Sequence, residues 1–177
     1  GFAFLTGFAL CIPVANWMIG NLGSFCVPNG PCLIPVAPGI MAPSGVLMIG
    51  LALVLRDLVQ RRLGLTWAFA AIILGVVLSA LLAPPALVLA SAAAFLLSET
   101  ADLAVYTPLQ KRGLVLAVAA SGAVGLVVDS VVFLLLAFGS LDFLAGQIIG
   151  KAWMVLLALP FIHLLRRHDA RRGILPA

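Results

Sequence analysis

The chain has 177 residues, of which 64% are hydrophobic and only 9% are charged. A water-soluble domain carries about 25% charged residues, so this composition excludes an ordinary soluble globule and indicates a protein surrounded by lipid. The formal net charge is +4. Because the basic residues gather in the connections between apolar stretches, we expect membrane lipid and no nucleic acid as the partner of these charges.

Six apolar stretches predict six membrane-spanning helices, since one spanning helix needs about 20 apolar residues. Proline-rich and basic joints separate them, such as Pro84-Pro85 and Arg61-Arg62. The first stretch lacks the basic leader and small-residue cleavage site of a signal peptide, so it is predicted to be a span. The expected spans form a single transmembrane domain over residues 1–177 and cover residues 2–20, 44–60, 65–83, 85–106, 113–138 and 143–165.

The positions of the basic residues predict how the spans are oriented. No Lys or Arg lies in the connections after the first, third and fifth spans. Cytoplasmic loops of membrane proteins carry an excess of Lys and Arg. We therefore expect an all-α six-helix bundle in a bacterial inner (plasma) membrane, with both termini cytoplasmic. Basic clusters follow the second, fourth and sixth spans, at Arg61-Arg62, Lys111-Arg112, and Arg166, Arg167, Arg171 and Arg172.

The connection over residues 21–43 is rich in Pro and Gly and has no charge, which makes it too broken for a long helix. On this topology it is extracytoplasmic, and it is either a re-entrant or lid-like loop over the bundle or a plain connector in the membrane interface. Cys26 and Cys32 lie on this side, where a disulfide is permitted. Both a Cys26–Cys32 disulfide and two free thiols remain open.

Small residues recur at every fourth position of several spans, which places them on one helix face and lets helix backbones approach closely. Simple helix packing explains such ladders. Two of them, however, end at an acidic residue, which should therefore face protein and not lipid. These two ladders are Ala90, Ala94, Ser98 and Asp102, and Ala117, Ser121, Gly125 and Asp129.

Six charged residues lie inside the predicted spans: Arg56, Asp57, Glu99, Asp102, Asp129 and Lys151. A charge near the bilayer centre costs about 2.5–3.5 kcal/mol, so such residues face the protein interior and often carry function. Depths counted along the helices predict two polar layers, one pairing Asp129 with Lys151 and one pairing Arg56 with Glu99 or Asp102. The pairs could simply fix helix register, but buried ion pairs rarely add net stability, which favours function.

These residues are candidates for contact with a small solute inside the bundle. Alternatives remain for Trp17 (an interfacial belt), Lys151 (a counter-ion only) and Arg56 (snorkelling). The predicted substrate-binding residues are Asn16, Trp17, Glu99, Asp102, Asp129, Gln147 and Lys151, supported by Arg56 and Asp57, with no metal and no cofactor.

Four runs of the sequence stand out: Leu55-Arg56-Asp57-Leu58, the stretch from Ser98 to Leu109 (SETADLAVYTPL), Val128-Asp129-Ser130, and the stretch from Gln147 through Lys151 to Pro160. They resemble the VUT family of queuosine-precursor transporters. The resemblance implies import of 7-cyano- or 7-aminomethyl-7-deazaguanine, and a six-helix fold similar to the S-components of energy-coupling-factor importers. A carboxylate accepts two adjacent N–H groups of the guanine-like edge of such a solute, an amide adds a hydrogen bond, and an aromatic ring stacks on the solute. The cation of an aminomethyl group would be met by a second carboxylate.

Two other functions are compatible with a membrane protein of this composition. One is an S-component that depends on an ATP-driven partner, for which the small-residue face of the first span is the cue. The other is an intramembrane enzyme, but Ser44 and Ser121 lack the preceding Gly of a rhomboid-type site, and no GxGD run precedes Asp129. No HExxH motif or phosphate-binding Gly loop is present either. We therefore expect a transporter and no enzyme, with a homo-oligomer or an energising partner left open.

Overall fold

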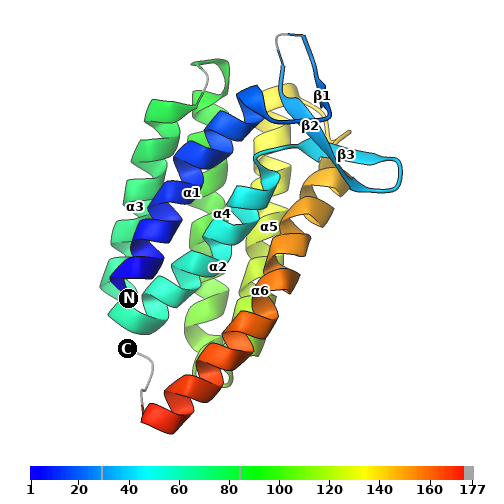
Figure 1. Cartoon of the computed structure of the whole chain (residues 1–177). Helices are drawn as coiled ribbons and strands as arrows, with labels where there is room; N and C mark the ends of the chain where they lie inside the picture. The colour runs from blue at the N-terminus through cyan, green and yellow to red at the C-terminus, as the bar shows by residue number, and fades with distance from the viewer. Residues whose placement is uncertain (29, 84, 174–177) are drawn as a thin grey trace.

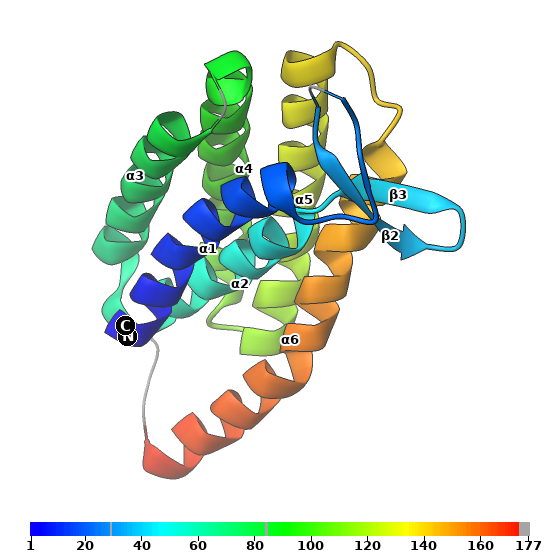
Figure 2. The same ribbon diagram turned by 45° about the horizontal axis from the view of Figure 1, so that its top comes forward.

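The computed structural model describes residues 1–28, 30–83 and 85–173. Six α-helices form a bundle with a small β-sheet at one end (Figures 1 and 2). Each predicted span corresponds to one helix, although the last helix continues well beyond residue 165. Pro84, part of the predicted joint between the third and fourth spans, lies outside the described residues. The helices are α1 (Phe2–Asn21), α2 (Val46–Leu63), α3 (Leu65–Leu82), α4 (Val88–Leu109), α5 (Leu114–Phe138) and α6 (Leu144–Arg172), with a short 3-10 turn, η1 (Pro85–Leu87), before α4.

The connections alternate between the two ends of the bundle. The start of α1, the α2–α3 turn, the α4–α5 turn and the end of α6 lie at one end, and the sheet lies at the other (Figure 1). The three basic clusters follow α2, α4 and α6, so they gather at a single end, which we call the basic end. This is the arrangement that the positive-inside rule requires of a six-span protein.

Five helices, α1, α3, α4, α5 and α6, are long and apolar enough to cross a membrane. The exception is α2, whose 18 residues include Arg56, Asp57, Arg61 and Arg62. α2 contacts each of the other five helices, so protein groups instead of lipid surround its charges. A hydropathy criterion misses such a helix because it assumes that every side chain of a span meets hydrocarbon.

Small residues bring the helices close enough to bury these charges. A Cβ at Gly50 of α2 would lie 2.7 Å from the backbone oxygen of Lys151 on α6. A Cβ at Gly125 of α5 would lie 3.0 Å from Asp102 Oδ2 on α4. The ladders on α4 and α5 are buried, and these two helices pack along each other. Their terminal acids, Asp102 and Asp129, face protein, as the ladders predicted.

The connection between α1 and α2 corrects the all-α prediction, because it contains a three-stranded antiparallel sheet in the order β1-β2-β3. The strands are β1 (Phe25–Cys26), β2 (Cys32–Ala37) and β3 (Ile40–Pro43). Its prolines argued correctly against a long helix, but proline is tolerated at bulges and strand ends: Pro35 of β2 adjoins a shift in the strand register, and Pro43 ends β3. Gly39, with φ of 72°, supplies the turn between β2 and β3. The sheet is fixed to α6, where the indole N–H of Trp153 donates to the Val36 carbonyl oxygen at 2.9 Å.

Cys26 and Cys32 are directly opposite each other on β1 and β2 and form a disulfide, while Cys11 is a buried free thiol. We expect alkylation of the unreduced, unfolded protein to label one cysteine, and alkylation after reduction to label all three cysteines of the chain, as measured by intact-protein mass spectrometry. In the control Cys26→Ser, two labels should appear with or without reduction. Three labels on the unreduced wild-type protein would contradict the disulfide.

Candidate functional site

A cavity lies inside the bundle on the side of the sheet, where Pro43 of β3 forms part of its wall. Most of its lining is apolar, and its polar side chains come from five different helices. Its free volume is about 60 Å³, below the roughly 300 Å³ at which small-molecule sites begin. A bicyclic solute therefore needs a wider cavity than the one in this structure, whose wall includes the half-buried side chains of Ile19 and Phe133. The polar lining residues are Asn16, Ser79, Ser91, Asp129, Gln147 and Lys151.

An ion pair between Asp129 of α5 and Lys151 of α6 forms the charged part of this cavity. Lys151 Nζ donates to Asp129 Oδ2 at 2.6 Å, to Gln147 Oε1 at 2.6 Å and to Ser130 Oγ at 2.9 Å. These three bonds use all three N–H donors of the ammonium group. The side chain of Lys151 is 1% exposed and that of Asp129 is 10% exposed. Lys151 is thus saturated within the protein, and Asp129 is the partner that a ligand can reach.

Asp129 keeps accepting capacity toward the cavity. Its Oδ1 receives only a long hydrogen bond of 3.4 Å from Ser98 Oγ, and an ionised carboxylate has about four lone-pair sites. Asn16 of α1 lies on the cavity wall, half-buried, and donates from Nδ2 to the Ile12 carbonyl oxygen at 2.9 Å. The cavity therefore offers one anionic acceptor and one amide among apolar surfaces.

Two aromatic side chains of the cavity, Phe95 and Phe133, were missed from the sequence. Phe133 follows Asp129 by four residues and Phe95 precedes Ser98 by three, so each shares a helix face with a predicted polar residue. That spacing was the available signal. Trp17, the predicted stacking residue, is instead 58% exposed on the outside of α1 and does not line the cavity. The aromatic surface of the cavity comes from the two phenylalanines.

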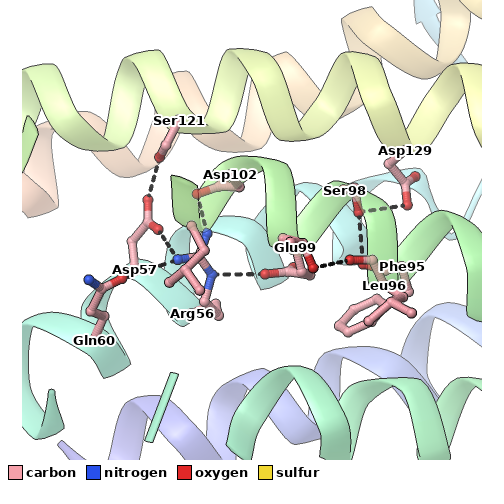
Figure 3. A network of polar contacts seen from close by, with 12 residues as sticks. Arg56, Asp57, Gln60, Phe95, Leu96, Ser98, Glu99, Asp102, Ser121 and Asp129 are labelled. Carbon is pink, nitrogen blue, oxygen red and sulfur yellow. Dashed lines mark hydrogen bonds and ion pairs between the residues drawn. The ribbon is translucent and has the colours of Figure 1, made fainter. Parts of the chain in front are cut away.

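Glu99 and Asp102 do not line the cavity either. They form, with Arg56 and Asp57, a second buried group that we call the Arg56 cluster (Figure 3). Arg56 Nε donates to Glu99 Oε2 at 2.9 Å, Arg56 Nη2 pairs with Asp102 Oδ1, and Arg56 Nη1 lies 3.1 Å from Asp57 Oδ1. All four side chains are at most 1% exposed, so Arg56 does not snorkel.

The cluster is held by further polar groups from neighbouring helices. Ser121 of α5 donates from Oγ to Asp57 Oδ2 at 2.9 Å. Gln60, one turn after Arg56, donates from Nε2 to Thr107 Oγ1 at 3.1 Å. Both ion-paired layers expected from the sequence are thus present, and α4 carries residues of each: Ser98 contacts Asp129, while Glu99 and Asp102 meet Arg56 (Figure 3).

A third ion-paired group lies at the basic end, and it was not predicted from the sequence. Asp169 of α6 is fully buried, 2.8 Å from Arg61 Nη2 and 2.5 Å from Arg62 Nη2. It ties the end of α6 to the end of α2. In the sequence Asp169 stands inside a basic tail, and nothing there distinguishes it from a solvated counter-ion. Only the bend of α6 toward α2 brings it to the two arginines.

The chain was compared with models of known protein families. Residues 80–165 match the family model described as "Putative vitamin uptake transporter". This stretch holds α4, α5 and most of α6, and so contains Glu99, Asp102, Asp129 and Lys151. The match confirms, over those residues, the resemblance drawn from the sequence. Searches of curated proteins and of solved structures gave no match.

Proposed function

We propose that the protein is a multi-pass membrane transporter that imports a small planar solute, because residues 80–165 match the family model described as "Putative vitamin uptake transporter" and five helices are long and apolar enough to cross a membrane. The candidate solute is a queuosine precursor, 7-cyano- or 7-aminomethyl-7-deazaguanine. The family match points to transport and away from catalysis. The proposal places the protein in a bacterial inner membrane.

The accessible carboxylate of Asp129 is the observation that carries this proposal. In a cavity with mostly apolar walls, a carboxylate binds a solute that offers two adjacent N–H donors, because such hydrogen bonds are charge-assisted and bidentate. A guanine-like edge has this pattern. Phe95 and Phe133 supply flat apolar surface for the ring system, and Asn16 supplies a further hydrogen bond. The geometry therefore favours Asp129 over Glu99 as the residue that holds the base edge.

The remaining predicted residues act in this proposal by positioning. Lys151 fixes the orientation of Asp129, and Gln147, one turn earlier on α6, accepts a bond from Lys151. Glu99, Asp102, Arg56 and Asp57 support the bundle from the neighbouring layer.

The direction of import follows from the two ends of the bundle. The basic end is cytoplasmic under the positive-inside rule. The sheet and its disulfide then face the oxidising outer compartment, where disulfides persist. The cavity lies on the sheet side, so it receives solute from outside.

The cue for an S-component that needs an ATP-driven partner is weakened by the structure. Most of the small-residue face of α1 packs inside the chain: a Cβ at Gly7 would lie 3.3 Å from Leu55 of α2, and Cys11 and Ala15 are buried, whereas Ala3 is exposed. Only the beginning of that face is free to meet a partner helix, which favours a self-sufficient transporter.

We expect Asp129→Asn to weaken binding of 7-cyano-7-deazaguanine at least about tenfold, because an amide offers one acceptor in place of a bidentate anion and a tenfold change corresponds to about 1.4 kcal/mol. Isothermal titration calorimetry of the detergent-solubilised protein measures the dissociation constant. Guanine and a panel of vitamins are titrated in the same way for comparison.

Two matched variants control this experiment. Asp142→Asn makes the same change in the exposed α5–α6 connection, and Trp17→Phe changes the outer face of α1. Both should bind like wild type. Equal affinity of Asp129→Asn and wild type would rule out the cavity as the site, and preference for a vitamin over deazaguanines would replace the proposed substrate.

A further inference from the structure

The Arg56 cluster has more negative than positive groups, and this imbalance needs a counter-charge. One guanidinium, from Arg56, faces the three carboxyl groups of Asp57, Glu99 and Asp102. Burial of an unpaired carboxylate away from water is so costly that such groups take up a proton instead of remaining charged. Three ionised carboxylates around one cation would leave two uncompensated charges in a site with at most 1% exposure.

Among the described residues, the elements around the cluster supply no second cation. α1 and α3 carry no charged side chain. Within the spans, α5 and α6 bring Asp129 and Lys151, and Lys151 is already bonded to Asp129, Gln147 and Ser130. Arg61, one turn beyond Asp57, is paired with Asp169. The Tyr106 ring lies 6.0 Å from the Arg56 guanidinium carbon and adds no charge.

Three buried polar atoms at the cluster have no hydrogen-bond partner among the described residues: Asp57 Oδ1, Asp102 Oδ2 and the Tyr106 hydroxyl. Buried polar atoms are nearly always paired, so each such exception calls for an explanation. The two carboxyl groups with an unpartnered oxygen, Asp57 and Asp102, contact the same Arg56 guanidinium, at its Nη1 and Nη2. Two carboxyl groups can share a hydrogen bond only if one of them holds a proton, because an ionised carboxylate has no donor.

We propose that the Arg56 cluster is a proton-binding site, that the proton is held between Asp57 and Asp102, and that it enters the cell together with the solute. The proton comes from the outer aqueous phase and is released to the cytoplasm, so one positive charge moves inward and no other bond changes. Membrane-embedded carboxyl groups serve as relays of this kind in transporters. Among the described residues, no group of three His, Cys, Asp or Glu side chains is placed to hold a metal ion.

The coupling between this proton and the solute rests on the proposed function and has a structural route. α4 contacts both sites: Ser98 is bonded to Asp129 at the cavity, and the next residue, Glu99, is bonded to Arg56. A solute that draws Asp129 away from Ser98 therefore alters the same helix turn that holds Glu99 against Arg56.

Infrared spectroscopy of the purified protein tests the proton site without any solute. The chain has 6 acidic side chains, and Asp129, Asp142 and Asp169 are ion-paired or exposed. At neutral pH we expect the C=O stretching band of a protonated carboxyl group, lost or shifted in both Asp57→Asn and Asp102→Asn and unchanged in Asp142→Asn. Absence of the band in wild type, or an unaltered band in both cluster variants, would overturn the proposal.

Uptake of 7-cyano-7-deazaguanine into proteoliposomes that contain a pH-sensitive dye tests the coupling. An acidic exterior should raise the initial uptake rate several-fold and acidify the lumen as solute enters. Asp102→Asn should keep its affinity for the solute but lose this stimulation.

If wild-type uptake does not depend on the pH gradient, or depends on a sodium gradient instead, the coupling is overturned and the proposed function stands. Failure of wild type to bind the solute removes the proposed function, whereas the infrared band still decides the proton site.

Discussion

Replacing Arg56 with glutamine should remove most of the stability of the folded protein, a loss of about 3–5 kcal/mol, which is typical when one partner of a buried ion pair is deleted. Arg56 is the one cation among three buried carboxyl groups from α2 and α4. Without it, those groups repel each other in a medium that cannot solvate them. Thermal unfolding in detergent, followed by tryptophan fluorescence, and the yield of monodisperse protein measure the effect.

Two comparisons separate this effect from a general loss of charge. Arg112→Gln, in the exposed α4–α5 turn, should leave the unfolding temperature unchanged. The double variant Arg56→Gln/Glu99→Gln removes one cation and one anion together, and it should recover part of the lost stability. An Arg56→Gln protein as stable as wild type would show that the cluster is not held by the guanidinium.

Replacing Gly50 with leucine should separate α2 from α6 and lower the free energy of unfolding by about 2–3 kcal/mol. A Cβ at this position would lie 2.7 Å from the Lys151 carbonyl oxygen and 2.9 Å from its Cα. Both are backbone atoms, so no side-chain rotation relieves the clash. Overpacking of this kind costs about 1–3 kcal/mol, and the rest of the leucine side chain adds to the strain, whereas the gain in helix propensity over glycine returns only about 1 kcal/mol.

Because Lys151 holds Asp129, Gly50→Leu should also weaken solute binding at the cavity. The matched control is Gly20→Leu on α1, where a Cβ would meet nothing within 4 Å. That variant should be as stable as wild type and bind solute normally. Equal behaviour of the two leucine variants in unfolding and calorimetry experiments would contradict the close packing of α2 on α6.

The helices could be predicted because each is a property of one short stretch of chain. Apolar runs of spanning length, the alternating basic clusters and the small-residue ladders all act within a single helix or at its ends. The depth count that paired Asp129 with Lys151 also needed only the helix rise, and the structure has that ion pair. The sheet could not be predicted in this way. Its strands β1, β2 and β3 form because they pair with each other and because the sheet is bonded to α6. No single stretch of the chain specifies these contacts.

The residues of the site show the same division. From the sequence alone came the six helices and the set of charged residues that must avoid lipid, because hydropathy and charge act residue by residue. The tertiary structure alone decided which charges share a site: Asp129 opens to a cavity beside Phe95 and Phe133, while Glu99 and Asp102 turn to Arg56. It also decided that Trp17 faces outward and that Asp169 meets Arg61. Side-chain partners depend on how helices rotate and cross, which follows from the packing of the whole bundle.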